Sequence, residues 1–219
     1  METEIEKLQT IKWEMRQKKL QPHQRKFVEK IARFLKENPK ALLNVRPMVY
    51  DSKEKEWILF FEAKKKYFLF CHPEADGKFT QADSLLVTEM SVKDANLVAH
   101  LSKNLRDTSM FTVQEKCLNF VGNEIVNAEL KKLDKDRQQM FLNLFLKNGT
   151  GNQLKIHTAE TCIPYNGFSY FKLDYPTGVP DDLNKAYQKM NRLNDEGPRK
   201  KYRDQRKKEA ALLRNAEKL

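Results

Sequence analysis

Glycine is scarce in this 219-residue sequence, and the loops that mark many nucleotide-binding enzymes are missing. None of the 7 glycines forms a Gly-x-Gly-x-x-Gly fingerprint or a P-loop. Because such loops let backbone amides approach a phosphate, their absence argues against a dedicated ATP, GTP or dinucleotide site. No Gly-x-Ser-x-Gly nucleophile elbow is present either. The sequence therefore favours a protein that is not an enzyme, and it predicts no cofactor.

Cysteine is equally scarce. The 3 cysteines, Cys71, Cys117 and Cys162, lie far apart and make no Cys-x-x-Cys pair. An odd and scattered set forms no disulfide framework. A split zinc site could combine them with His72 and His157, but zinc sites usually have close local ligand pairs. We expect free thiols in a reducing compartment, which is the cytoplasm, or the nucleus in a eukaryotic cell.

Long apolar runs are also missing. The longest are Trp57 to Phe61 and Tyr67 to Cys71, whereas a membrane-spanning helix needs about 20 apolar residues. The first residues are acidic and contain no apolar signal core. The sequence predicts neither a membrane span nor secretion.

The residues that are present favour an α+β fold. Hydrophobic residues make up 40% of the chain and include 13 phenylalanines, enough for a packed core. Apolar residues at helical spacing predict helices over residues 4–20, 22–37, 91–105, 113–132, 135–147 and 181–193. Aromatic and branched residues predict strands over residues 42–50, 57–63, 67–72, 84–89, 154–158 and 167–173.

These elements suggest one compact body and one extension. We expect a helical N-terminus on a small antiparallel sheet, with charged turns at residues 51–56 and 64–66. A helical middle, capped at Ser91, and a C-terminal β-hairpin complete the body over residues 1–196. Because Gly197-Pro198 breaks the last helix, residues 197–219 are predicted to form a basic helical extension.

The C-terminal segment is the most informative part of the sequence. Residues 199–219 hold nine Lys and Arg against three Asp and Glu, a net charge of +6 out of +11 for the chain. On a helix, Arg199, Arg203, Arg206 and Lys207 would lie on one side, about one turn apart. Cations in such a row neutralise nucleic-acid phosphates and release counterions without reading the bases.

The sequence therefore predicts a non-enzymatic protein that binds DNA or RNA through this segment. Tyr202 lies among the cations, where its ring could stack on an unpaired base. The predicted nucleic-acid-binding residues are Arg199, Lys200, Lys201, Tyr202, Arg203, Arg206, Lys207 and Lys208. In the alternative interpretation, Leu212, Leu213 and Leu219 dock a protein partner or a second copy. The chain would then be a structural or assembly protein of a viral or ribonucleoprotein particle.

A second basic cluster lies in the middle of the chain. Lys64, Lys65 and Lys66 precede Tyr67 and Phe68, and cations beside aromatic rings on a sheet can form a platform for single strands. A lysine-rich turn is the commoner explanation, since lysines at a sheet edge also discourage pairing between molecules.

A metal-dependent nuclease is the third hypothesis. Asp51 and Glu62-Ala63-Lys64 resemble the Asp…Glu-x-Lys pattern in which two carboxylates hold Mg²⁺ and a lysine positions water, and Glu29 could add an acid. A hairpin over residues 51–63 would separate the two carboxylates by roughly 20 Å, too far for one ion. We therefore predict no catalytic residue and no metal ligand.

Overall fold

The computed structural model describes residues 9–73, 79–105, 112–161 and 167–194. The strands are β1 (Gln9–Trp13), β2 (Leu43–Val49), β3 (Leu154–Ile156), β4 (Glu160–Thr161) and β5 (Ser169–Asp174). The helices are α2 (Pro22–Glu37), α3 (Asp51–Cys71), α4 (Gln81–Glu89), α5 (Ala95–Lys103), α6 (Val113–Val121) and α7 (Asn123–Lys147). A further helix covers residues 181–194. The α+β class is confirmed.

The strands form one mixed sheet rather than the antiparallel meander that the sequence suggested. Its order is β1-β5-β2-β3, with β4 also paired to β2. The pairs β1–β5 and β5–β2 are antiparallel, whereas β3 and β4 run parallel to β2. The predicted C-terminal hairpin is wrong, because β5 lies between β1 and β2 while β3 pairs with the far side of β2.

Pro47 explains why two short strands share that far side of β2. The β3 pairing ends at Val45, and the β4 pairing begins at Met48. Proline has no backbone N–H to give to a neighbouring strand, so pairing is interrupted at this point.

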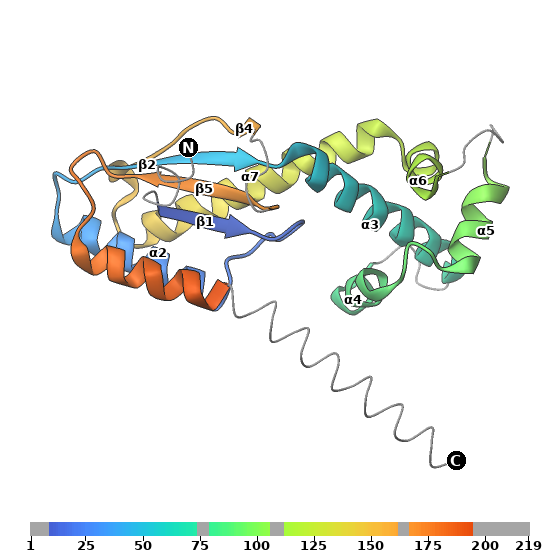
Figure 1. The fold of residues 1–219 in the computed structure, drawn as a ribbon, viewed down its shortest axis with the longest axis horizontal. Coiled ribbons are helices and arrows are strands. Elements are labelled where there is room, and N and C mark those ends of the chain that lie inside the picture. The colour runs from blue at the N-terminus through green and yellow to red at the C-terminus, as the bar shows by residue number, and fades with distance from the viewer. Residues whose placement is uncertain (1–8, 74–78, 106–111, 162–166, 195–219) are drawn as a thin grey trace, which may run out of the picture.

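The described residues form two main cores and a small third cluster of Phe61, Phe68 and Val87 between α3 and α4. Figure 1 shows the sheet at one end of the molecule and the short helices at the other. The core of the sheet lobe packs one face of the sheet against α2, the end of α7 and helix 181–194. Its largest buried side chains include Trp13, Phe141 and Phe145. The second core, in the helical lobe, joins α3, α5, α6 and the first half of α7.

The N-terminal helix predicted over residues 4–20 is wrong where the structure describes it, because residues 9–13 form β1. Ile11 and Trp13 are fully buried in the sheet-lobe core, whereas Thr10 and Lys12 are only half-buried. The two-residue alternation of a strand therefore decides this segment, although its apolar residues also match a helical spacing.

The strands predicted over residues 57–63 and 67–72 are both part of α3, as are the turns predicted at residues 51–56 and 64–66. This helix contacts α4, α5, α6 and α7, so it buries apolar residues on several sides and shows no single apolar stripe. The strand predicted over residues 84–89 is likewise helical, since it forms most of α4.

The helix boundaries of the middle region also differ from the prediction. Gly122 ends α6 and begins α7 with φ +90°, a conformation that L side chains rarely adopt. The predicted helix over 113–132 is therefore divided there, and α7 continues through the predicted break before residue 135. Asp94, not Ser91, caps α5 by accepting hydrogen bonds from the amides of Asn96 and Leu97.

Other predicted elements are confirmed. Pro22 occupies the first turn of α2, and Asn38 caps its end. The strands β2, β3 and β5 and helix 181–194 lie where the sequence placed elements of their type. Within the described ranges, no helix is long and apolar enough to cross a membrane. The predicted extension, residues 197–219, lies outside the described residues.

Candidate functional site

The basic segment predicted to bind nucleic acid lies outside the described residues, but the last described residue before it lies on the sheet lobe. The predicted binding residues are Arg199, Lys200, Lys201, Tyr202, Arg203, Arg206, Lys207 and Lys208. The last described residue, Asn194, has its side-chain oxygen 2.6 Å from a ring nitrogen of His23. The neighbouring Gln24 donates a 2.6 Å hydrogen bond to the carbonyl of Lys12 in β1. The chain thus reaches residue 194 beside the β1 edge of the sheet.

One face of the sheet points away from the sheet-lobe core. In β5 every second residue from Ser169 is buried and the others are half-buried, and β1 and β2 alternate in the same way. Because strand side chains alternate between two faces, the less buried set shares the second face. Figure 1 shows α7 behind these strands and no described helix crossing in front of them. We call this second face the open face.

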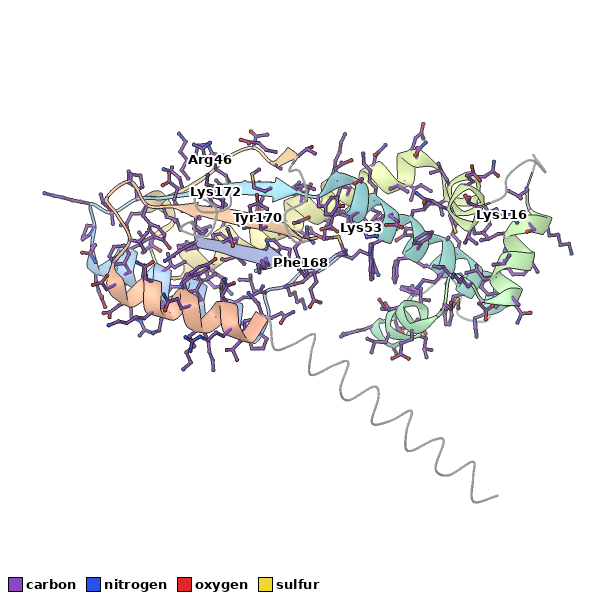
Figure 2. All side chains as sticks on the ribbon, in the orientation of Figure 1. Arg46, Lys53, Lys116, Phe168, Tyr170 and Lys172 are labelled. Atoms are coloured by element: carbon purple, nitrogen blue, oxygen red, sulfur yellow. The ribbon has the colours of Figure 1, made fainter. Side chains whose placement is uncertain are left out.

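Aromatic and basic side chains occupy the centre of the open face. Phe168, Tyr170 and Lys172 follow one another at two-residue spacing along β5 and its N-terminal end, and all three are half-buried. Arg46, which is exposed, is the register partner of Lys172 on β2. On the other side, Lys12 is the register partner of Tyr170 on β1. Figure 2 shows the labelled β5 residues in a line with Arg46 beside them.

The open face carries more positive than negative charge. Its cations are Lys12, Arg46, Lys155 and Lys172, and its acids are Asp174 at the C-terminal end of β5 and Glu160 on β4. Among the described side chains, no carboxylate lies within 4.0 Å of the charged groups of Arg46 and Lys172. These two cations are therefore available to an anion from solution.

The mid-chain lysine cluster does not form a platform on a sheet. Lys64, Lys65 and Lys66 lie within α3. The ammonium of Lys64 donates to the carbonyls of Thr88 and Met90 at the end of α4, at 3.3 and 3.0 Å. That of Lys66 donates to the carbonyl of Phe120 near the end of α6, at 3.1 Å, while Lys65 pairs with Glu62. Cations at helix C-termini are favourable, so these lysines hold the helical lobe together.

The carboxylates of the nuclease hypothesis do not converge. Asp51 lies in the first turn of α3, and Glu62 lies three turns further along the same helix. At 1.5 Å per residue, their backbones are roughly 16 Å apart along the helix axis, too far to share one ion. Lys64 is buried against α4 and does not point at either carboxylate in a shared site.

The cysteine and histidine side chains give no metal centre in the described ranges. Cys71 is exposed at the end of α3, and the ring of the adjacent His72 stacks on Phe68 with 4.2 Å between centroids. Cys117 is buried in the helical lobe, and burial raises the pKa of its thiol to about 11. No group of three or more His, Cys, Asp or Glu side chains in these ranges lies close enough to hold a metal ion. Cys162 lies outside them.

A buried ion pair joins the two lobes. Arg137 of α7 donates a 2.7 Å hydrogen bond to a carboxylate oxygen of Glu54 in α3, and both side chains are almost completely buried. The same oxygen accepts a 2.9 Å hydrogen bond from Ser169 of β5, and the other accepts one from the backbone amide of Arg16. The Glu54 carboxylate thereby ties together the loop after β1, the start of β5 and both long helices. This network holds the N-terminal end of β5 and so positions Phe168 and Tyr170.

Asp134, one turn before Arg137, is a carboxyl group whose ionisation opposes folding. Burial raises its pKa to about 6, although Arg137 acts in the opposite direction. The pKa of Asp134 in the folded protein lies above its unfolded value of about 3.9. The loss of stability caused by its ionisation is therefore absent below about pH 4 and complete above about pH 6. We expect Asp134→Asn to raise the melting temperature by a few degrees at pH 7.5 and to leave it unchanged at pH 4. The shift is small because the group is partly solvated. Thermal melts of both proteins across this range measure the difference, and a larger gain at pH 4 would contradict it.

The residues of the open face are the ones that sequence reasoning missed. The strand over 167–173 was predicted correctly, so its alternation placed Phe168, Tyr170 and Lys172 on one face. The opposite face also carries an aromatic residue, Phe171, so the sequence did not show which face was buried. The sequence therefore contained the alternating pattern, but only the position of α7 and α2 on one face of the sheet shows which side chains are buried.

Comparison of the chain with protein-family models, with curated proteins and with solved structures finds no significant match.

Proposed function

We propose that this protein binds nucleic acid without catalysis and that its basic C-terminal segment supplies largely sequence-independent contacts to phosphates. The observation that carries the proposal is the distribution of charge. Residues 199–219 carry +6 of a total of +11, in about a tenth of the chain. A dense cation cluster gains affinity for a polyanion by releasing its counterions. The scattered cysteines fit a reducing compartment, and we propose the cytoplasm.

The interactions of lysines and arginines in the described residues favour the C-terminal segment as the phosphate-binding part of the chain. Many lysines and arginines of the body have partners within it: Lys64 and Lys66 bond to backbone carbonyls, Arg137 to Glu54, and Lys55 to Asp51. Such groups lose part of their present interactions if they turn to a phosphate. The C-terminal segment holds three times as many cations as acids, so most of its cations have no acid within the segment to pair with.

The proposal is tested by neutralising four cations of the segment. Replacing Arg203, Arg206, Lys207 and Lys208 by Gln keeps helix propensity but removes up to four phosphate contacts. For duplex DNA, the slope of log affinity against log salt should become less steep by about 3 to 4, at roughly 0.9 per contact. Fluorescence anisotropy titrations of a labelled duplex at several salt concentrations measure the slope.

The matched control removes the same charge from the body. Lys26, Lys30, Arg33 and Lys36 lie on the exposed side of α2. Replacing these four by Gln lowers the net charge equally. An effect of net charge alone, wherever the cations lie, would therefore change the slope to the same extent. We expect their replacement to change the slope by less than about 1. Equal effects of the two quadruple variants would refute a specific role for the C-terminal segment.

An assembly protein is the second candidate, and exposed apolar side chains of the helical lobe favour it. Phe70 is 67% exposed, and Leu85 and Leu86 of α4 are 64% and 57% exposed. Association through such a surface persists at high salt, because apolar contacts are not screened, whereas phosphate contacts weaken. Sedimentation of the protein alone at low and high salt separates the two candidates.

A further inference from the structure

The open face of the sheet has no assigned role in the contacts described so far, although its centre is aromatic and basic. Sheet faces that remain in contact with solvent are commonly polar. Here Phe168 and Tyr170 lie on the face with Met48 and are only half-buried. Aromatic rings at such positions offer flat π surfaces to a ligand with flat rings of its own.

The spacing of the Phe168 and Tyr170 rings fits an extended single strand of nucleic acid better than a duplex. Residues two apart on a strand are roughly 6.6 to 6.8 Å apart. That is about twice the 3.4 Å rise between neighbouring nucleotides of duplex DNA. Neighbouring bases can therefore stack on both rings only after they separate from each other, which a single strand allows. In a duplex each base is stacked on its neighbours and paired, so its faces are not accessible.

The charges around the rings fit the backbone of such a strand. Lys172 continues the line of Phe168 and Tyr170, and its register partner Arg46 lies on the adjacent strand. Lys12 lies beside Tyr170 on the opposite side. Cations beside an aromatic line, such as Arg46 and Lys172, can contact the phosphates next to stacked bases. An arginine can also donate two parallel hydrogen bonds to one phosphate.

The position of residue 194 connects this face with the C-terminal segment. Asn194 contacts His23, and the adjacent Gln24 is hydrogen-bonded to the carbonyl of Lys12. The five residues to Arg199 can span at most about 18 Å, at 3.6 Å per residue. The first cations of the segment are therefore tethered within reach of the β1 edge of the open face. A tether of this length makes the second contact of one ligand effectively intramolecular.

We propose that the open face is a binding site for single-stranded nucleic acid, in which Phe168 and Tyr170 stack bases while Arg46 and Lys172 contact phosphates. This inference rests on the proposed function and deepens it, because it assigns the substrate class. The C-terminal segment holds any polyanion, and the open face selects strands with accessible bases.

The test uses the full-length protein with three labelled probes: oligothymidylate, oligouridylate and a DNA duplex. We expect Tyr170→Ala to weaken binding of at least one single-stranded probe by roughly tenfold, as expected for loss of one stacked base. Duplex affinity should change by less than about twofold, because the cations of the C-terminal segment hold the duplex, whose stacked and paired bases do not engage the open face. Tyr170→Phe keeps the π surface and should bind all three probes as the unchanged protein does.

Two further variants keep the test independent of folding. Arg46 is exposed, so Arg46→Gln does not disturb the core, and it should reduce the steepness of the salt dependence for the single-stranded probe by about 0.7. Phe70→Ala removes another exposed aromatic ring, at the far end of α3, and should leave all affinities unchanged. Circular dichroism confirms that each variant has the secondary structure of the unchanged protein.

The outcomes separate the two proposals. If the unchanged protein binds none of the probes, the proposed function itself fails. If it binds them, but Tyr170→Ala and Arg46→Gln change single-strand and duplex affinity equally or not at all, the open face is not the site. In that case the proposed function stands without it. Preferential loss of single-strand binding in both variants supports the site, and the stronger of the two single-stranded probes identifies DNA or RNA as its preferred ligand.

Discussion

Replacing Glu54 by Leu is expected to lower the free energy of unfolding by roughly 3 to 5 kcal/mol. Glu54 is completely buried and pairs with Arg137 at 2.7 Å, so its removal leaves the guanidinium buried without its hydrogen-bonded ion-pair partner. The variant also loses the acceptor for Ser169 and for the amide of Arg16. For a chain of this size, such a loss corresponds to a fall of roughly 10 °C in melting temperature, which thermal or urea denaturation measures.

A neighbouring acid provides the control. Glu56 lies two residues further along α3 and pairs with Lys53 near the surface. Because surface ion pairs contribute little, Glu56→Leu should cost less than about 1 kcal/mol. The double variant Glu54→Leu, Arg137→Met should regain part of the lost stability, since neither charge is left buried alone. Equal losses for Glu54→Leu and Glu56→Leu would show that the buried pair does not hold the two lobes together.

Parts of the fold whose apolar residues all face one core could be predicted from sequence. In α2 the stripe of Phe27, Val28, Ile31 and Leu35 faces the sheet-lobe core, and proline residues mark both ends. The alternation of β2 and β5 was equally clear. In each case, local pattern and tertiary burial indicate the same element.

The sequence-based predictions were wrong where one helix has neighbours packed against several of its sides. The run from Trp57 to Phe61 looks like a strand because it is short, aromatic and apolar. In the structure it belongs to a helix that packs against four others, and its lysines extend to carbonyls at the ends of α4 and α6. A single sequence does not show which neighbours surround a segment, so continuous apolar runs remain ambiguous between strand and buried helix.

The candidate site, like the fold, could be predicted from the sequence only in part. The charge of residues 199–219 can be read from composition alone. The neighbourhood of Arg46, Tyr170 and Lys12 depends on the insertion of β5 between β1 and β2, which brings residues about 125 to 160 positions apart into register. No local pattern in the sequence encodes this pairing, because strand order follows from the packing of the whole lobe.

Deletion of residues 199–219 is expected to abolish most binding to duplex DNA while the body stays folded. Helix 181–194, with Leu183 and Met190 buried in the sheet-lobe core, precedes the Gly197-Pro198 break, so we expect that core to form without the deleted segment. If six cations of the segment contact phosphates, the full-length protein should show a slope of log affinity against log salt near −5. A fourfold rise in salt then weakens its binding roughly 10³-fold, and the truncated protein should lose most of this dependence.

The central claim is tested most directly by duplex titrations of the full-length and truncated proteins at about 50 mM and about 200 mM salt, the range over which phosphate contacts dominate affinity. We expect a slope near −5 for the full-length protein and a slope between about −1 and 0 for the truncated one, with unchanged circular dichroism. Equal affinities and equal slopes for the two proteins would contradict it, because the C-terminal segment would then contribute no phosphate contact.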